Sequence, residues 1–490
     1  MKAIEVMGHW EAIKQRLDLT VRLGYVQVYT EALNGLVDAL GSRFRSALRK
    51  GYSAGAAIGL FVLFLSVFVL LYNLVVSGYS LIPFLLSSSQ SLSDGLSSST
   101  DPSSASSAAS KLPDFGVMTP IVPGINLPTS HLAPFFLAVF IAAAFHELGH
   151  ALAATAEGIQ LNGFGVFLLV LYPGAFADLS SHLLSLMHYD RIKVFAAGAF
   201  HNLLLSALAL ICIVLLPFLL SPLYQVPSDS VVVSSVHPLS PLAAHITAGE
   251  QILSLNRCRL EGQGQASWSE CLDRIHAASV EGFCMPHDFI VGEQDANGNA
   301  CCHSDAPSKL QCFALSAFAE PSLCTSARLA ADRFRQCSHG LSDCADGELC
   351  ATPALLPSEK LVKISKANDD FVLYAGHLST LWHGIEVSRY LPRFALFSSF
   401  LLACPHPLYL MLYYIATLST GLGVLNLVPA YWLDGEHIMG SILHILWPDD
   451  LKKRKRWGRI VLRSSTFLLV ANIVVSLIIL YYRNRFENQV

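Results

Sequence analysis

Long apolar runs, separated by polar stretches, dominate the chain. The first run, 55–76, carries no charged side chain, and a helix needs about 20 such residues to cross the hydrocarbon core of a bilayer. Further apolar runs follow at 132–156, 192–220, 408–428 and 466–482. The pattern predicts a polytopic α-helical membrane protein with about five spans.

A shorter apolar segment, 163–177, departs from this pattern. Gly165, Pro173 and Gly174 interrupt it, and it is too short to cross a bilayer as a helix. Extended or irregular backbone is tolerated at membrane depth only where other protein surrounds it. We therefore predict a re-entrant or strand-like hairpin that other parts of the protein enclose.

The chain changes character between 221 and 393, where polar residues surround short β-prone runs. Residues 241–244 and 248–255 resemble a stretch of PDZ domains, with Glu250 where aspartate is usual. A PDZ-like β-rich domain is thus predicted, with 281–350 as a cysteine-rich insertion. An unrelated small β domain is the alternative, because a single matching stretch is a weak signal.

Cysteines concentrate in this polar part of the chain. Ten of the 12 cysteines lie between Cys258 and Cys350, including the adjacent pair Cys301 and Cys302. A clustered, even number of cysteines favours disulfide bonds and therefore an oxidising lumen. A zinc knuckle is the alternative, but the spacings do not form paired Cys-x-x-Cys motifs.

The composition limits the classes of function. The chain is 53% hydrophobic and 14% charged, against roughly 25% charged in ordinary soluble domains. The formal net charge of −4 provides no basic field for a nucleic-acid backbone. We expect a protein of the lipid bilayer that does not bind nucleic acid directly.

Basic residues flank two of the predicted spans. Lys and Arg are frequent in 43–50, and 452–456 is an uninterrupted run of Lys and Arg. Because cytosolic loops carry an excess of basic residues, we predict a cytosolic N-terminus, a luminal cysteine-rich block and a luminal C-terminus. Residues 1–50 contain no recognisable cleavable signal, so the first span is expected to be an uncleaved anchor.

The second predicted span carries a polar cluster. Its only ionisable side chains are those of His146, Glu147 and His150. Residues four apart share a face of a helix, so both histidines can bind one Zn²⁺, and Glu147 beside them can act as general base. The alternative is a cluster that joins helices through hydrogen bonds, but ionisable groups are costly in a span without a function for them.

Zinc bound by two histidines needs a further protein ligand, and Asp434 is the candidate. Pro429 removes a helical hydrogen bond and Gly435 permits a tight turn, so the helix is expected to break and leave Asp434 on irregular backbone facing a cavity. A solvated loop aspartate is the alternative.

These residues together resemble a known family, the site-2 proteases, which are membrane-embedded zinc metalloproteases. The eukaryotic, Golgi-type branch is the most similar, because it combines a serine-rich luminal loop with a cysteine-rich, PDZ-containing domain. The resemblance rests on the run 145–150 and on the N-x-x-P-x-x-x-L-D-G element at 426–435. Further matching runs are 123–128, 162–165, 172–176 and 198–202.

The resemblance implies one zinc ion bound by His146, His150 and Asp434, with Glu147 as the catalytic base. Asn202 and Asn426 are candidates for positioning the substrate backbone or stabilising an oxyanion. Hydrogen bonding between helices is the alternative role for each asparagine.

The implied activity is hydrolysis of a peptide bond inside a transmembrane helix. The expected substrates are membrane-tethered transcription factors, such as sterol-regulatory-element-binding proteins, after a first luminal cleavage, in Golgi or endoplasmic reticulum membranes. The luminal domain would admit or dock the shortened stub. A metal transporter and a catalytically inactive scaffold are the alternatives.

The predicted organisation has six parts. Residues 87–110 are rich in serine and are expected to form a disordered loop. The parts are a cytosolic segment (1–54), the first span (55–76), a luminal serine-rich loop (77–131), the catalytic membrane core (132–220), the luminal PDZ-like domain (221–393) and a C-terminal membrane core (394–490).

Overall fold

The computed structural model describes residues 18–93, 121, 125–170, 172–278, 281–297, 310–315, 321–337, 344–356, 358–394 and 398–487. The chain divides into two compact units. One, the membrane unit, comprises Met1–Val214 and Tyr409–Val490, and the other, the β unit, comprises Leu215–Leu408.

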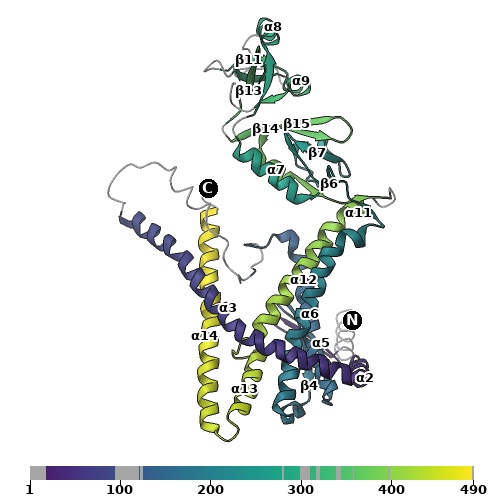
Figure 1. Cartoon of the computed structure of the whole chain (residues 1–490), viewed down its shortest axis with the longest axis vertical. Coiled ribbons are helices and arrows are strands. Elements are labelled where there is room, and N and C mark those ends of the chain that lie inside the picture. Colours follow the sequence, from purple (N-terminus) through teal and green to yellow (C-terminus); the bar gives the residue numbers. More distant parts are fainter. Residues whose placement is uncertain are drawn as a thin grey trace, which may run out of the picture. The chain divides into compact units, whose positions relative to one another are not determined.

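Five helices among the described residues are long and apolar enough to cross a membrane (Figure 1), which confirms the predicted number of spans. Their apolar stretches lie at Arg45–Tyr79, Thr129–Ala156, His188–Leu220, Ser398–Asn426 and Leu451–Tyr482. The helices are α3 (Arg45–Ser93), α5 (Leu132–Ala156), α6 (His188–Leu220), α11 with α12 (Ser398–Ala403, Pro405–Asn426) and α14 (Leu451–Glu487).

Two of these helices are longer than predicted. The basic run 452–456, which flanks the predicted span 466–482, belongs to the first turns of α14. Helix α3 continues to Ser93, so the start of the serine-rich stretch is helical. The rest of the predicted loop, 94–110, lies outside the described residues.

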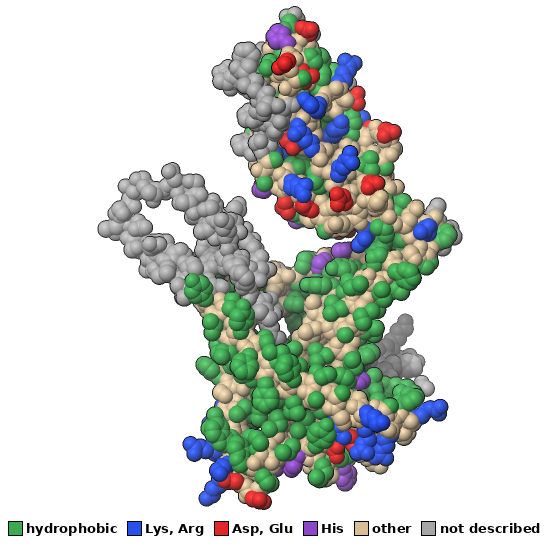
Figure 2. Space-filling model, viewed as in Figure 1, with side chains coloured by type: hydrophobic (Ala, Val, Ile, Leu, Met, Phe, Trp, Pro, Cys, Tyr) green, Lys and Arg blue, Asp and Glu red, His purple; other side chains and the backbone are tan. Residues whose placement is uncertain are grey.

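Apolar side chains cover much of the face of the membrane unit that Figure 2 shows. Phe61, Phe64 and Phe68 of α3 are more than half exposed, as expected for side chains that face lipid. The interior contains smaller or polar residues, including Ala142 and Ala196, which have no exposed surface. Asn73 donates a hydrogen bond to Asn472 across 2.9 Å, joining α3 to α14. Close approach and buried polar pairs are the usual basis of helix packing in lipid.

The membrane unit also contains a four-stranded antiparallel sheet in the order β1-β2-β3-β4. The predicted hairpin adopts its strand form, as β3 (Leu161–Leu169) and β4 (Tyr172–Leu179). The other two strands, β1 (Leu19–Arg22) and β2 (Tyr25–Thr30), were not predicted. Their partner is the hairpin, far away in the sequence, so local patterning did not reveal them. Strands β1 and β4 are the two edges of the sheet.

Shorter helices complete the membrane unit. They are α2 (Asn34–Arg43), α13 (Asp434–Leu446), and the 3-10 turns η1 (Thr129–His131) and η2 (Ser181–Ser185).

The β unit is built on a six-stranded sheet whose main path is β15-β14-β7-β6-β16, with β8 paired to β7. Its core includes Val231, Ile252, Leu255 and Trp268, none of which has exposed surface. The strands are β6 (Val231–Val236), β7 (Gln251–Leu255), β8 (Cys258–Arg259), β14 (Glu359–Lys366), β15 (Phe371–His377) and β16 (Ile385–Ser388). Other elements are η3 (Pro241–Ala244), α7 (Gln265–Ala277), α10 (Leu378–Gly384) and the paired strands β5 (Tyr224–Gln225) and β17 (Leu391–Pro392).

The cysteine-rich segment forms a second sheet between α7 and β14, with the order β11-β10-β13-β9-β12. Since both flanking elements belong to the first sheet's part of the chain, this segment is arranged as an insertion. Its elements are β9 (Gly282–Pro286), α8 (His287–Asn297), β10 (Gln311–Leu315), β11 (Pro321–Thr325), α9 (Ala327–Arg333), β12 (Gln336–Cys337) and β13 (Glu348–Pro353).

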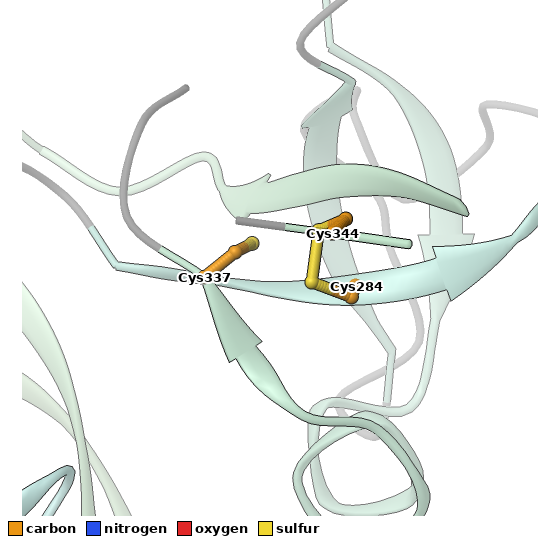
Figure 3. Close-up of side chains that lie close together, drawn as sticks. All are labelled: Cys284, Cys337 and Cys344. Atoms are coloured by element: carbon orange, nitrogen blue, oxygen red, sulfur yellow. A yellow bond between two sulfur atoms is a disulfide. The ribbon is translucent and has the colours of Figure 1, made fainter. Parts of the chain in front are cut away.

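Disulfides hold this part of the chain together, which confirms the predicted bridging. One disulfide joins Cys258 of β8 to Cys271 of α7. Two others lie together: Figure 3 shows the disulfide between Cys284 and Cys344 beside the sulfur of Cys337, and Cys337 is bonded to Cys350. Cysteines in disulfides cannot provide the thiolates of the alternative zinc knuckle. The adjacent pair Cys301 and Cys302 lies outside the described residues.

Candidate metal centre

Three side chains that are far apart in the sequence meet inside the membrane unit. His146 and His150 come from α5, and Asp434 is the first residue of α13. Nε2 of His146 lies 3.0 Å from Oδ2 of Asp434 and 3.1 Å from Nε2 of His150. The third distance, from His150 Nε2 to the same carboxylate oxygen, is 3.3 Å. The sequence-predicted ligand set therefore forms one compact triangle of donor atoms.

Helix α5 determines the orientation of both imidazole rings. They are one turn apart and only 5% and 7% exposed, so their rings share the face of α5 that packs on α6. Nδ1 of His150 lies 2.9 Å from the Val194 carbonyl of α6. That carbonyl can only accept, so Nδ1 carries the proton and Nε2 keeps its lone pair for a metal.

A glycine on α6, Gly198, leaves room for the imidazole rings. A Cβ on Gly198 would lie 2.4 Å from His150 Nε2 and 2.7 Å from His146 Nε2. On the facing helix, a Cβ on Gly149 would lie 2.6 Å from the Ala197 carbonyl oxygen. Both glycines are required by close approach of α5 and α6.

The predicted interruption of the helix before Asp434 is present, but its geometry differs from the prediction. Helix α12 ends at Asn426 and α13 begins at Asp434, so the carboxylate lies in the first turn of a helix and not on irregular backbone. In the segment between the two helices, Trp432 has a positive backbone φ angle of 69°. Gly435 is not needed for a turn. A Cβ there would lie 2.1 Å from the Val428 carbonyl oxygen, so close backbone packing excludes a side chain.

The donor triangle fits a zinc ion. Tetrahedral zinc bound to imidazole nitrogen and carboxylate oxygen at about 2.0–2.1 Å keeps its ligand atoms about 3.3 Å apart. The three separations are 3.0 Å, 3.1 Å and 3.3 Å. Two histidines and one carboxylate are also a donor set found in catalytic zinc sites, which leave one position open.

Asn202 of α6 contacts the outer nitrogen of His146. Its Nδ2 lies 3.2 Å from His146 Nδ1, and the residue has no exposed surface. Its Oδ1 is buried without a hydrogen-bond partner among the described residues. The oxygen and nitrogen of an amide are interchangeable in shape, so the hydrogen-bond network decides their assignment.

Asn426, at the end of α12, lies on the other side of the same ring. Its Nδ2 is 3.3 Å from Nε2 of His146, the nitrogen that belongs to the donor triangle, and the side chain is partly exposed. The two asparagines that the sequence singled out therefore occupy different places. Asn202 contacts the back of a ligand, and Asn426 contacts the face where a metal would bind.

Glu147 contacts the sheet. Its Oε2 accepts a hydrogen bond of 2.9 Å from the backbone N–H of Ala177 in β4, and the side chain is partly exposed. One carboxylate oxygen is thus fixed by the backbone of an edge strand.

Several residues that shape the metal centre were not predicted from the sequence. Ala177 and Val194 act through their backbones, so side-chain chemistry gave no signal for them. Gly198 and His201 lay in a run noted only for its family resemblance. His201 accepts or donates a hydrogen bond of 2.9 Å with Tyr52 of α3, and the two rings stack.

A polytopic helical unit with this His-His-Asp centre and a glutamate beside it defines a membrane-embedded zinc metallopeptidase. Residues 134–471 match peptidase family M50. This match covers more than half of the chain, and the chain belongs to that family. It is also similar to the membrane-bound transcription factor site-2 protease homolog of Arabidopsis thaliana, with 28% identity over 391 residues, 68% of this chain and 74% of that protein. The predicted metallopeptidase class and the resemblance to site-2 proteases are confirmed.

Proposed function

We propose that the protein is an intramembrane endopeptidase that binds one zinc ion through His146, His150 and Asp434. The observation that carries this proposal is the triangle of donor atoms with edges of 3.0–3.3 Å, formed by residues from two separate helices. A structural cluster would need no such match to the ligand spacing of zinc.

Glu147 is the proposed general base. Zinc in this centre would polarise the scissile carbonyl and lower the pKa of a water molecule. Glu147 takes the proton of the attacking water and later passes it to the leaving amine. The Ala177 N–H fixes one carboxylate oxygen, which leaves the other free to handle the proton.

The neighbours of the histidines select the tautomers that can bind metal. The Val194 carbonyl keeps the proton of His150 on Nδ1. Asn202 does the same for His146 if its amide is turned so that Oδ1 accepts from Nδ1–H. That orientation also gives the buried Oδ1 its missing partner. Such outer partners of metal-binding histidines fix the ring orientation.

Asn426 is the proposed contact for the developing negative charge. Its amide nitrogen lies beside the donor triangle, on partly exposed backbone at a helix end. An N–H donor there can stabilise the oxyanion more strongly than the ground-state carbonyl, which is the requirement for lowering the barrier.

The substrate segment would be unwound where it is cleaved. A helix hides its own backbone, so a carbonyl becomes accessible only after local unwinding. Strand β4 is one of the two edge strands of its sheet, and its Ala177 already contacts Glu147. An extended substrate backbone can pair with such an edge strand, which would place it next to the general base.

The proposed substrates are membrane-anchored transcription factors of the sterol-regulatory-element-binding type, already cleaved once on the luminal side. The name of the Arabidopsis thaliana relative, a membrane-bound transcription factor site-2 protease homolog, supports this class of substrate. The β unit would be a luminal PDZ-like domain that admits or docks the shortened stub, in Golgi or endoplasmic reticulum membranes. Its disulfides support an oxidising compartment. The N-terminus would be cytosolic and the C-terminus luminal.

The test uses purified full-length protein in liposomes with a single-helix substrate that has a short luminal stub. We expect one zinc ion per chain and a peptide cut within the helix, with no zinc transport across the bilayer. Zinc transport without a peptide product would support a transporter instead. Digestion of the cysteine-rich block from the cytosolic side of sealed vesicles would contradict the proposed topology.

A further inference from the structure

Basic side chains from three helices gather at one end of the membrane unit, away from the metal centre. The rings of His188 and His444 stack, with centroids 4.8 Å apart and an angle of 28°. His188 also lies within electrostatic reach of Arg191 and Arg454. We call these four residues the basic cluster: His188 and Arg191 from the first turn of α6, His444 from the last turn of α13, and Arg454 from the first turn of α14.

Three members of the basic cluster have buried nitrogen atoms without a hydrogen-bond partner among the described residues. These atoms are Nδ1 of His188 and Nε of Arg191 and Arg454. An arginine Nε can only donate, and a histidine Nδ1 donates whenever it carries a proton. Buried polar groups in folded proteins are nearly always partnered. Each of these three side chains therefore has a donor that the described residues do not use.

Two carboxylates close to the cluster in sequence, those of Asp190 and Asp450, pair with lysines. Asp190 pairs with Lys193 at 2.7 Å, and Asp450 pairs with Lys453 at 3.4 Å. Arg454 donates to the Pro448 carbonyl through Nη1, at 3.1 Å. No ion pair to Arg191 or Arg454 occurs within the part of the chain that the structure describes. The positive charge of the basic cluster is thus left for an external anion.

The location of the basic cluster indicates where the anion comes from. His188 and Leu451 begin two of the helices that are long and apolar enough to cross a membrane, so we expect the cluster to lie near a bilayer surface. Trp447 and Trp457 stack nearby in the sequence, and such aromatic pairs are typical of the interface. Figure 2 shows Lys and Arg side chains gathered below the apolar surface of α14. Phosphate headgroups occupy this level of a membrane.

We propose that the basic cluster binds the phosphate group of an anionic lipid headgroup. The N-termini of α6 and α14 both contribute to it, and helix N-termini favour anions. Two arginines provide charge-assisted donors of the kind that phosphate prefers. The exposed residues Lys452, Lys453, Lys455 and Arg456 would attract the anionic membrane surface around the site.

Occupation of the site has a structural consequence for the enzyme. Helix α13 begins at Asp434 in the metal centre and carries His444 in its last turn. A bound headgroup would join that last turn to α6 and α14. The lipid would thereby hold both ends of the helix that supplies the third metal ligand.

The test measures binding of a fluorescent short-chain phosphatidylinositol phosphate to the full-length protein in detergent. A phosphatidylcholine analogue serves as the neutral lipid, and inorganic phosphate as the competitor. The variant Arg191→Gln/Arg454→Gln removes two charges from the basic cluster. The matched control Lys455→Gln/Arg456→Gln removes two exposed charges from the same turns of α14. Zinc content and elution volume report whether each variant is folded.

We expect the dissociation constant to rise about thirtyfold in Arg191→Gln/Arg454→Gln and less than about threefold in the control. Arg191→Lys/Arg454→Lys keeps both charges and should recover most of the binding. Equal losses in the two Gln pairs, or equal binding of the neutral lipid, would overturn the proposal. Displacement by inorganic phosphate at the same concentration as by the lipid would keep the phosphate site but assign it to free phosphate.

Discussion

The Cβ position of Gly198 on α6 lies 2.4 Å from Nε2 of His150 on α5. This nitrogen is one corner of the donor triangle, so the glycine borders the space that a zinc ion would share. The position is set by helix packing and not by an unusual backbone angle. A metal centre inside a helix bundle thus depends on a residue that has no chemistry of its own.

Gly198→Ala should therefore remove zinc without removing any ligand. The added methyl group would be far inside the contact distance of both imidazoles, which would have to turn away. We expect loss of bound zinc and of cleavage, measured by metal analysis and by turnover of a transmembrane substrate. Gly421→Ala is the matched control, because a Cβ at Gly421 would meet nothing within 4 Å. Normal zinc and normal cleavage in Gly198→Ala would contradict the predicted steric conflict between the methyl group and the two imidazoles.

Asp434→Ala should lose zinc together with activity, because the carboxylate is the third corner of the triangle. The control is Glu436→Ala, which removes an acidic side chain from the same first turn of α13. Glu436 accepts a hydrogen bond from the Trp432 N–H, so its loss should leave zinc bound. If both variants retain zinc and cleave normally, Asp434 is an ordinary helix-capping acid.

The sequence was sufficient for those parts of the site that local spacing determines. Two histidines one turn apart must share a helix face, so His146 and His150 were predictable once the span was recognised. Pro429 was a reliable sign that α12 would end before Asp434. The role of Gly435 was misjudged, because its need for space arises from the Val428 carbonyl, which no local pattern reveals.

The features that the sequence did not predict depend on contacts between distant segments. Strands β1 and β2 alternate apolar and polar residues, but they are stable as strands only through pairing with β3, more than a hundred residues away. The N–H that fixes Glu147 belongs to the backbone of Ala177 and is unrelated to its side chain. The basic run at 452–456 was treated as a topology signal, and its helical structure appeared only with α14 packed against α3 and α13.

Asn202→Leu should weaken zinc binding by about 10–100-fold, as is usual when the outer partner of a metal-binding histidine is lost. Asn202→Asp is the discriminating variant, since a carboxylate can accept from Nδ1–H of His146 but cannot donate to it. We expect Asn202→Asp to bind zinc far better than Asn202→Leu in metal titrations. The opposite order would mean that the amide nitrogen faces His146 and that this ring does not present Nε2 to the metal.

Removal of the disulfide between Cys258 and Cys271 should destabilise the β unit. The sequence separation is 13 residues, and a loop of this size corresponds to about 3 kcal/mol of unfolding free energy. Cys258→Ala/Cys271→Ala should unfold at lower denaturant concentration, while Cys212→Ala, at a free cysteine, should not. Mass spectrometry without reducing agent should find the linked peptides in the wild type. Free thiols at both positions there would contradict the prediction.

Glu147→Gln separates proton transfer from metal binding. The amide nearly preserves the size of the side chain, and its oxygen can still accept from the Ala177 N–H, but it cannot take a proton from water. Zinc should remain bound, while cleavage of a single-helix substrate should fall by about 10²–10⁴-fold. His150→Ala is the companion variant, and it should lose both zinc and cleavage because it deletes a corner of the donor triangle.

The two variants together distinguish a protease from a metal carrier. A carrier would produce no peptide in the wild type, and Glu147→Gln would alter the movement of zinc instead. The measurement therefore follows peptide product and bound zinc in the same liposomes for the wild type and both variants. Wild-type cleavage in Glu147→Gln would rule out this residue as the base even with zinc present, because the amide cannot take a proton from water. Asp434 is not expected to replace it, since its carboxylate lies within 3.3 Å of both histidines.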